Sequence, residues 1–510
     1  MSVGPVQATG RASGDPNTAM TVSLSGSGAA SHTGDPNAPI TLVQVPVHNA
    51  ERSDTAIFDL SSSQPLPINA VGATAGRIVV SNSSLDITAG ASAAATSETE
   101  PSVTVDSGGR LNVVAGTLES VHTIIGLASA SPSQALVSNE GTRWENEGRM
   151  TVGHGGPGRL FVFDGFLGSA EARIGGPNGA GDAQVSGPHA LWNTGNIAVG
   201  FGGQPGTLTI DNGGTVSSGL LNAFSVIGLA AGSGNRVSVQ GVDPNSGQAS
   251  TWTVDGELRV GDAGEGTLEI LDGGTVSSGL LVVANGAATG TVVVRGRSAN
   301  GEPSRLHTIQ TRADIGEQGI GSLQVMDGAE ALFEGDLSAG IGGDATIVVS
   351  GFAQSGGQER LDQPARLQGE AGLSLGQGAA ATLQVQRGGL VDIRQDITVK
   401  PARDFQRAAG HGLYQHQRRR AERAGAHARA GRPADGSRRR VALAAAVSRP
   451  QCVACVGVVR SPGHLACGSA GALRSHQSPA SSATKGVMSP NSTRPLPLQS
   501  PLRMLQAGCC

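Results

Sequence analysis

Apolar and polar side chains alternate in short runs along the middle of this chain. The alternation is clear at Leu208/Ile210, Val237/Val239, Leu268/Ile270 and Leu323/Val325. A period of two places the apolar side chains of each run on one face and the Thr, Ser, Glu or Gln between them on the other. Each run therefore predicts a half-buried strand of about four or five residues.

Glycine pairs follow these runs and predict tight corners. Asn212 precedes one pair and Asp272 precedes another, in the segments 212–214 and 272–274. Glycine adopts the positive φ values that such corners need. Strand and corner recur about every twenty residues, which is typical of a coil.

The same units recur as a long repeat. GTLTIDNGGTVSSGLL at Gly206–Leu221 and GTLEILDGGTVSSGLL at Gly266–Leu281 agree at 13 of 16 positions. Weaker copies begin at Ser102, Gly158, Gly321 and Ala381. This self-similarity predicts a repeat architecture.

Two further elements accompany each copy. One ends in an aliphatic residue and a glycine, at Gly153, Gly200, Gly261, Gly316 and Gly376, spaced by 47, 61, 55 and 60 residues. Trp144, Trp192 and Trp252 each lie eight or nine residues before such a glycine, so all three tryptophans occupy one repeat position. The other element reads IIGLA from Ile124, RIGGP from Arg173 and VIGLA from Val226.

A parallel β-helix accounts for this repeat better than a propeller of the kelch type. Kelch blades pack large aromatic side chains between sheets, whereas this chain has a single Tyr. The interior of a narrow coil suits Val, Ile, Leu and Ala. We expect each repeat to hold two or three rungs, stacked about 4.8 Å apart with aliphatic ladders inside.

Composition agrees with an all-β chain. It has 78 glycines among 510 residues, 13 aromatic residues and 15% charged residues. No apolar run is long enough for a transmembrane helix, and no collagen-like period of three is present. The start of the sequence shows no secretion signal.

Charge and cysteine divide the chain near residue 400. Residues 401–510 contain 17 of the 36 basic and three of the 40 acidic residues, a net charge of +14, which leaves −18 for residues 1–400. All five cysteines lie in the same terminal part. We therefore expect a flexible or degenerate leader at 1–50, a β-helix at 51–400 that is clearest at 100–393, and a disordered basic tail at 401–510.

The tail carries little recognisable chemistry. GC-rich codons that are translated in the wrong reading frame yield many Arg and few Lys residues. The excess of Arg over Lys in this tail therefore favours a frameshift before it. Arg418–Arg420 and Arg438–Arg440 suit phosphates, but Phe405 and Tyr414 are the only rings there, so no specific nucleic-acid binding is expected. Cys452 and Cys455 form a single CxxC near His464 and Cys467, which is too little for a metal prediction.

No catalytic or cofactor-binding residue stands out in the body. Asp211, Asp272 and Asp327 recur with the repeat, which favours a corner role. The histidines His122, His154, His189 and His307 lack a metal-ligand spacing, so we interpret them as loop residues facing solvent. The glycine-rich segments Gly153–Gly158 and Gly200–Gly206 lack the Lys-Ser/Thr of a phosphate loop. We predict no catalytic site, no cofactor and no metal.

The order Trp, Gly, L-x-V-G and then G-x-L-x-I-x-x-G-G-x-V resembles the repeat of bacterial autotransporter (type V secretion) passengers and of some PEP-CTERM surface proteins. The resemblance covers about residues 100–393. It implies a right-handed β-helix passenger that a carboxyl-terminal outer-membrane barrel exports to the cell surface. The alternating strands of such a barrel are missing here, so the sequence predicts a truncated passenger.

These observations favour a non-enzymatic, monomeric, surface or secreted β-helix. Its expected role is display or adhesion to a host or environmental surface or carbohydrate. The alternative is a carbohydrate-active β-helix enzyme, a polysaccharide lyase or glycosidase, that uses groove carboxylates and Arg. The sequence leaves the ligand, export and the reading frame of residues 401–510 open.

Overall fold

The computed structural model describes residues 71–98, 101–219, 224–310, 312–355 and 358–400, and separate strands at 8–10, 20–23, 29–32, 40–43, 55–59, 66–68 and 441–444. Contacts divide the chain into Met1–Arg460 and Ser461–Cys510, and every described residue belongs to the first unit. The described secondary structure consists of strands and turns. No helix there is long and apolar enough to cross a membrane.

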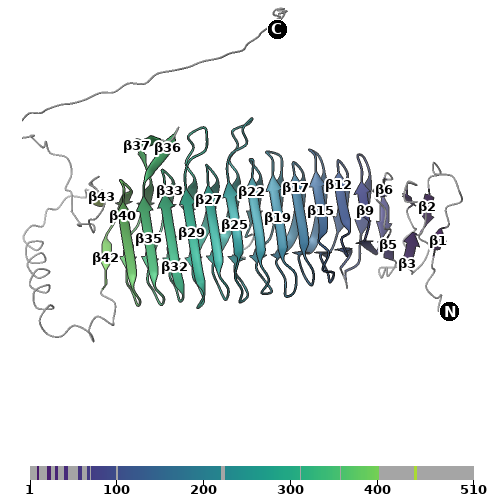
Figure 1. Cartoon of the computed structure of the whole chain (residues 1–510), viewed down its shortest axis with the longest axis horizontal. Helices are drawn as coiled ribbons and strands as arrows, with labels where there is room; N and C mark the ends of the chain where they lie inside the picture. The colour runs from purple at the N-terminus through teal and green to yellow at the C-terminus, as the bar shows by residue number, and fades with distance from the viewer. Residues whose placement is uncertain are drawn as a thin grey trace, which may run out of the picture. The chain divides into compact units, whose positions relative to one another are not determined.

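The strands of the coils form three parallel ladders, of which the second and third belong to one sheet, and the coils stack side by side (Figure 1). The first ladder contains β2 (Met20–Ser23), β4 (Ile40–Val43), β6 (Leu66–Ile68), β9 (Ser84–Ile87), β12 (Arg110–Val114), β15 (Ser133–Ser138), β17 (Gly158–Phe163), β19 (Gly181–Ser186), β22 (Gly206–Asp211), β25 (Asn235–Gln240), β27 (Gly266–Leu271), β29 (Thr289–Arg295), β32 (Ile320–Met326), β35 (Ala345–Ser350) and β40 (Ala381–Gln386).

The second ladder contains β7 (Ala73–Ala75), β10 (Ser92–Ala95), β13 (Thr117–Ser120), β20 (Leu191–Thr194), β23 (Thr215–Ser218), β30 (Arg305–Thr308), β33 (Glu330–Phe333), β38 (Arg366–Gly369) and β41 (Leu390–Ile393). Four long strands run through the second ladder and into the third, namely β16 (Arg143–Val152), β18 (Phe166–Ile174), β26 (Thr251–Val260) and β28 (Thr275–Val283).

The third ladder contains β1 (Ala8–Gly10), β3 (Ala29–His32), β5 (Thr55–Asp59), β8 (Arg77–Ser81), β11 (Val103–Asp106), β14 (Thr123–Ile125), β21 (Ile197–Val199), β24 (Phe224–Ile227), β31 (Arg312–Ile315), β34 (Asp336–Ala339), β39 (Leu373–Leu375) and β42 (Ile397–Val399). Outside the ladders, β36 (Phe352–Ser355) and β37 (Gln358–Pro364) form an antiparallel hairpin, and β43 (Val441–Ala444) pairs antiparallel with β41.

This arrangement confirms the predicted all-β parallel β-helix. Partner residues in the first ladder are separated by one coil, from 19 residues between Leu66 and Leu85 to 36 between Ala345 and Ala381. Gly206 and Gly266, which begin the two clearest copies of the repeat, are two coils apart through β25. The repeat thus holds two coils, and from Gly158 onward each coil is longer than the expected twenty residues because corners carry extra residues.

The core is a stack of aliphatic columns. In the first ladder, the alternation seen in the sequence points both apolar side chains of each strand inward and the polar side chain between them outward, and both apolar positions are buried in every coil from β9 to β35. One column contains Leu85, Leu111, Ala135, Leu160, Ala183, Leu208, Val237, Leu268, Val292, Leu323 and Ile347, each no more than 1% exposed. Removing this apolar surface from water on every rung stabilises the stack.

The three tryptophans lie in one interior column of the second ladder. Trp144 pairs in register with Leu167, which pairs with Trp192, and Val216 separates Trp192 from Trp252. All three indoles are fully buried. The interior therefore accepts an aromatic ring on alternate coils, where the sequence analysis expected aliphatic side chains.

From Gly126 to Gly376, the residues that follow the third-ladder strands also stack in a column, and all but one of them are glycine. The residues Gly126, Gly153, Gly175, Gly200, Gly228, Gly261, Ala284, Gly316, Gly340 and Gly376 all have φ between 60° and 83°. Each N–H donates to the strand one coil earlier, as Gly200 does to the Ile174 carbonyl at 2.7 Å. The two sequence elements treated as separate are therefore one corner on alternate coils.

The glycine pairs work differently from the prediction. Positive φ falls on the first two residues of the corner, Asn212 (49°) and Gly213 (85°), as it does on Asp272 (50°) and Gly273 (94°). The second glycine is required for space, because a Cβ on Gly214 would lie 2.4 Å from the Val185 carbonyl oxygen. Stacked corners approach too closely for a side chain there.

Several predictions are not tested by this structure. The right-handed sense of the coil and the division at residues 50 and 400 stay predictions. The frameshift, the basic segments Arg418–Arg420 and Arg438–Arg440, Phe405 and Tyr414, and the CxxC at Cys452 and Cys455 with His464 and Cys467 lie outside the described residues.

Candidate functional site

One edge of the β-helix, between the first and second ladders, alternates between two kinds of corner. Tight corners at 212–214, 272–274, 327–329 and 387–389 follow β22, β27, β32 and β40. A hydrogen bond across three residues closes each of them, as from the Gly214 N–H to the Asp211 carbonyl at 2.9 Å. On the coils between them, the corner opens into a longer segment.

Each of the longer corners is closed by the same kind of backbone hydrogen bond. The N–H of Ser250 donates to the Gly241 carbonyl at 3.0 Å, Ser304 to Gly296 at 3.0 Å, and Ala365 to Gly351 at 2.8 Å. The chain between these partners leaves the coil as the loops 242–249, 297–303 and 352–364, which we call the loop row. All three project from the same edge of the stack (Figure 1). Loops two rungs apart are separated by about 10 Å along the stack.

Serine side chains anchor two of these loops to the preceding tight corner. Ser250 Oγ accepts the Gly213 N–H at 3.1 Å, and Ser304 Oγ accepts the Gly273 N–H at 3.0 Å. Ser304 Oγ also donates to the Arg295 carbonyl at 2.6 Å. The bases of these two loops are thus hydrogen-bonded to the coil beneath them.

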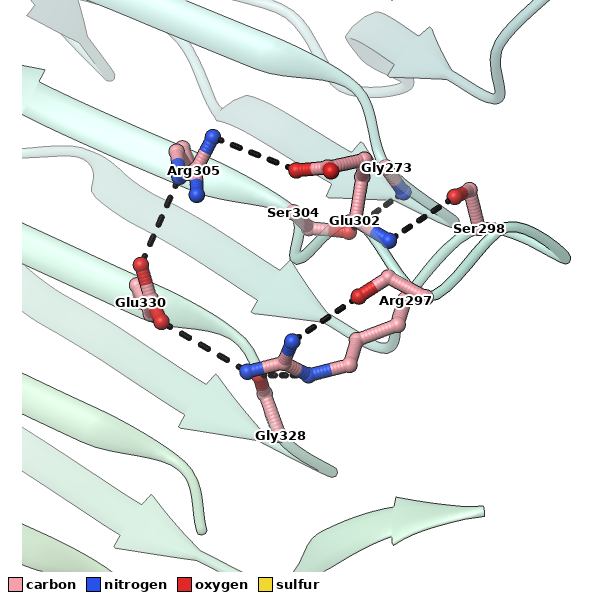
Figure 2. A network of polar contacts seen from close by, with 9 residues as sticks. Gly273, Arg297, Ser298, Glu302, Ser304, Arg305, Gly328 and Glu330 are labelled. Atoms are coloured by element: carbon pink, nitrogen blue, oxygen red, sulfur yellow. Dashed lines mark hydrogen bonds and ion pairs between the residues drawn. The ribbon is translucent and has the colours of Figure 1, made fainter. Parts of the chain in front are cut away.

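Arg297 fixes the path of the second loop (Figure 2). Its guanidinium donates to the Gly301 carbonyl at 2.9 Å, within the loop, and to the Gly328 carbonyl at 3.0 Å, on the next coil. Glu330 lies 3.5 Å from Arg297 and 3.4 Å from Arg305. This network ties the loop to two strands, although residues 299–302 at its tip are exposed.

A shallow groove of about 640 Å³ lies where the loop row begins. Its lining comes from four successive coils, namely Phe163, Asp164, Ser186, Gly187, Pro188, His189, Asn212, Asp243, Asn245 and Ser246. Asp164 Oδ1 accepts the His189 N–H at 3.1 Å, and Asp164 has a positive φ of 56°. Polar side chains, an imidazole and a phenyl ring therefore meet in one open depression.

Asp243 organises the loop wall of the groove. Its Oδ2 accepts N–H groups of Ser246 at 2.5 Å and Asn245 at 3.1 Å. The hydrogen bonds from Ser246, together with smaller contributions from Asn245 and the His189 charge, hold the pKa of Asp243 below its usual range. An ionised carboxylate bound to backbone N–H groups shapes a loop and is poorly suited to donate a proton.

A carboxyl group with a raised pKa lies elsewhere. Asp314, on the outer face of the third ladder between Val282 and Ser338, is 1% exposed, and burial raises its pKa to about 6 despite the charge of Arg312. Arg312 Nε lies 2.5 Å from Asp314 Oδ2. Asp314 does not line the groove.

The candidate residues of the sequence analysis are distributed over several surfaces. Asp272 and Asp327 occupy corner positions with positive φ, as predicted, whereas Asp211 is the last residue of β22. His307 lies on β30, where Nε2 is 2.9 Å from Glu334 Oε1, and so is a strand residue rather than a loop residue. Within the described ranges, no group of three His, Cys, Asp or Glu side chains has the geometry of a metal site.

The other histidines are brought together in ways the sequence did not indicate. His189 lines the groove beside the loop row, while His122 and His154, although 32 residues apart, share a second depression on the third ladder. The glycine-rich segments 153–158 and 200–206 are stacked corners rather than phosphate loops. A Cβ on Gly156, for example, would lie 1.9 Å from the Ser129 carbonyl oxygen.

The alternation of tight and open corners is a feature that sequence reasoning missed. A signal for it is present, because the segments 242–249 and 297–303 each contain Asn and a Gly and interrupt the repeat at intervals of two coils. Taken alone, each segment resembles ordinary spacing between strands.

Similar proteins were found by sequence and by structure, but not among family models. No model of a known protein family matches the sequence. A stretch of 192 residues, 35% of this chain, is 26% identical to an uncharacterized lipoprotein, YdeK, of Escherichia coli (strain K12), and spans only 14% of that relative's length. A solved TibC-catalysed hyper-glycosylated TibA fragment aligns with 78% of this chain and 98% of its own, at 13% identity and a TM-score of 0.26, which is too low to carry an argument.

Proposed function

We propose that this chain is a non-enzymatic, surface-displayed β-helix of the passenger type whose loop row mediates adhesion. The observation that carries the proposal is the placement of three exposed loops on one edge of a uniform stack, on every second coil. A rigid stack presents such loops in fixed register. Weak contacts made in register combine into strong attachment.

The location is inferred from the sequence resemblance and from the name of one relative. The resemblance to autotransporter passengers covers most of the described coils, and the lipoprotein YdeK, similar over 35% of the chain, supports a place in the cell envelope.

A carbohydrate-active enzyme is the second candidate, favoured by the groove at Asp164 and His189. Its chemistry requires a general acid or a base of suitable pKa beside the substrate. Asp243 is ionised and bound by backbone N–H groups, and Asp314 lies buried on the third ladder. These placements favour binding over catalysis.

The proposal is tested with beads coated with the full chain and retained under flow on polysaccharide, matrix or cell surfaces. A triple variant replaces the complete open corners, 241–250, 296–304 and 351–365, with the three residues Asn-Gly-Gly of the tight corner at 212–214, whose flanking strands pair in register with those of the open corner 241–250. A variant with only 241–250 replaced serves as the graded control. We expect retention to fall in steps, with the triple variant losing more than the sum of single losses.

Equal retention of the wild-type chain and the triple variant contradicts the proposed role of the loop row. Release of reducing ends from a polysaccharide by the wild-type chain, abolished by Asp164→Asn, establishes the enzymatic alternative. Surface display is tested separately by adding protease to intact cells that produce the chain. Full protection of the chain in intact cells contradicts display.

A further inference from the structure

A second depression lies on the outer face of the third ladder, away from the loop row. It has a volume of about 180 Å³, comparable to one sugar ring, and is lined by Pro101, His122, Thr123, Ile124, Arg149, Thr151, His154, Arg173 and Phe201. Ile124, Thr151 and Arg173 are consecutive partners in register on β14, β16 and β18 and form its floor. His154 and Phe201, which follow the corner glycines Gly153 and Gly200, form a wall. We call this depression the basic slot.

Glu171 holds the two arginines of the basic slot in place. Its carboxylate accepts Arg149 Nε at 2.8 Å and Arg173 Nε at 2.7 Å, one on each oxygen. Burial acts to raise the pKa of Glu171, but the hydrogen bonds and charges of Arg149 and Arg173 outweigh it, so the pKa is lowered. Glu171 is therefore ionised at neutral pH, and both guanidinium groups are oriented by it.

Each arginine keeps hydrogen-bonding capacity. Glu171 uses only the Nε of each, and among the described residues no hydrogen bond engages an Nη group of either side chain. A guanidinium has five donors in a planar fork that fits a carboxylate. The two side chains thus retain donors for a further acceptor.

His122 adds a donor of defined orientation. Its Nδ1 accepts the Arg149 backbone N–H at 3.0 Å, so the neutral ring carries its proton on Nε2. The ring lines the basic slot. A neutral imidazole N–H is a suitable partner for a hydroxyl or carboxylate oxygen.

Phe201 supplies an apolar wall. Its ring lies 6.5 Å from that of His154 at an interplanar angle of 13°, and the Arg173 guanidinium lies 5.3 Å from its centroid. Stacked rings offer a flat face to the C–H groups of a pyranose, and the nearby cation is favourable against the same ring. A flat ring wall beside hydrogen-bond donors is suited to a sugar.

The net charge of the basic slot indicates what charge a bound sugar should carry. Two arginines and one glutamate give the basic slot a net charge of about +1 within a body of residues 1–400 whose net charge is −18. A monoanionic carboxylate matches that charge, whereas a dianionic phosphate would leave an excess of negative charge. We infer that the basic slot binds one carboxylate-bearing pyranose unit, with the carboxylate on Arg149 and Arg173 and the ring against Phe201.

The chain contains a matched control for this site. Glu257 Oε1 accepts Arg259 Nε at 2.9 Å, and the Arg259 guanidinium lies 4.4 Å from the Phe224 ring, on β26 and β24. This group repeats the Glu-x-Arg and Phe arrangement of the basic slot with a single arginine and lines neither the groove nor the basic slot. Substitution of Arg259 therefore reproduces the change in charge without affecting the proposed site.

Calorimetric titration of the full chain tests the inference with trigalacturonate and 3′-sialyllactose as two sources of a carboxylated pyranose. Methyl-esterified trigalacturonate and lactose are the neutral counterparts, and acetate is the free carboxylate. We expect at least one acidic sugar to bind tenfold or more tightly than its neutral counterpart and than acetate. Binding of neither acidic sugar, or equal binding of the acidic and neutral sugars or of acetate, overturns the inference.

Variants assign the binding to the basic slot. The affinity for the acidic sugar should fall tenfold or more in each of the variants Arg173→Gln, Arg149→Gln and Phe201→Ala, and should stay unchanged in Arg259→Gln. Circular dichroism identifies a variant that fails to fold. If Arg173→Gln does not fold, the affinity of Arg149→Gln tests the inference, because Arg149 is the more exposed of the two arginines. Equal loss in Arg259→Gln and Arg149→Gln indicates a general charge effect and contradicts a specific site. The loop-row variants of the adhesion test keep this slot intact, so the two proposals fail independently.

Discussion

The indole Nε1–H of Trp252 donates to Ser218 Oγ, one coil earlier, at 3.0 Å. The same contact joins Trp192 to Ser169 at 3.1 Å and Trp144 to Ser120 at 2.9 Å. In each case the serine lies two residues after the apolar residue that stacks directly beneath the indole. An interior that buries a tryptophan on alternate coils thus satisfies its single polar group by a side chain from the neighbouring coil.

Replacement of Ser218 tests this pairing. Ser218→Ala leaves the fully buried indole N–H of Trp252 without its acceptor and should lower the free energy of unfolding by about 1–3 kcal/mol. Urea unfolding followed by tryptophan fluorescence measures the change. Ser217→Ala, which alters an outward-facing residue of the same strand, is the control and should change stability by less than about 0.5 kcal/mol. Equal effects of the two substitutions would show that the buried hydrogen bond has no special weight.

Gly214 tests the close stacking of corners. A Cβ at this position would lie 2.4 Å from the Val185 carbonyl oxygen, and neither coil can move without disturbing its ladder. Gly214→Ala should therefore lower the free energy of unfolding by about 3 kcal/mol or more. Gly247, with φ +74° and no atom within 4 Å of the position a Cβ would take, lies in an open loop, and Gly247→Ala should lower it by only about 1–2 kcal/mol. A smaller effect at Gly214 than at Gly247 contradicts the packing argument.

Arg297 tests whether side-chain anchoring makes the loop 297–303 rigid. Arg297→Gln removes the donors to Gly301 and Gly328 and should increase amide exchange at 298–303 by about tenfold or more, since these bonds hold the loop from both sides. Hydrogen exchange with mass spectrometry measures the change peptide by peptide. Arg295→Gln removes an exposed ion pair with Asp327 on the same edge and should leave exchange in this loop unchanged. Similar exchange in both variants contradicts the anchoring role.

The fold could be predicted from sequence because its signal is repeated. The alternation at Leu208/Ile210 and Leu268/Ile270 recurs in nearly every coil, so errors at single positions do not matter. The corner at Asn212 was predicted for the right residue types but with the wrong division of roles between Gly213 and Gly214. Local preference shows that a glycine is needed, whereas the reason for the second glycine is the distance to Val185 on another coil.

The basic slot could not be predicted in the same way. Arg149, Arg173 and Phe201 come from three different coils, and their proximity depends on coil lengths that vary from 19 to 36 residues. A change of one residue in register would move the strand residues Arg149 and Arg173 to the interior. The repeat therefore predicts the scaffold, while the site depends on the residues in which the coils differ.

Asp314 provides a prediction for the pH dependence of stability. The folded-state pKa of about 6 lies above the unfolded value of 3.8, because burial on the third ladder disfavours the ionised form more than Arg312 favours it. A raised carboxyl pKa contributes stability that is fully present below the unfolded pKa and is lost as pH rises through the folded pKa. The contribution is therefore present at pH 3.5 and lost at pH 7.5, with the change between about pH 4 and pH 6.

Asp314→Asn removes this dependence and isolates it from the other carboxyl groups. As the pH rises from 3.5 to 7.5, the wild-type chain should lose on the order of 2–3 kcal/mol of unfolding free energy relative to the variant, since one pKa unit corresponds to about 1.4 kcal/mol. Urea unfolding at intervals of half a pH unit measures it, with Asp255→Asn at an exposed position as the control. Asp314 lies beside Val282 and Ser338, and its carboxylate is 2.5 Å from Arg312 Nε. A flat difference across this range would therefore mean that water reaches the carboxylate and that the outer face of the third ladder is open there.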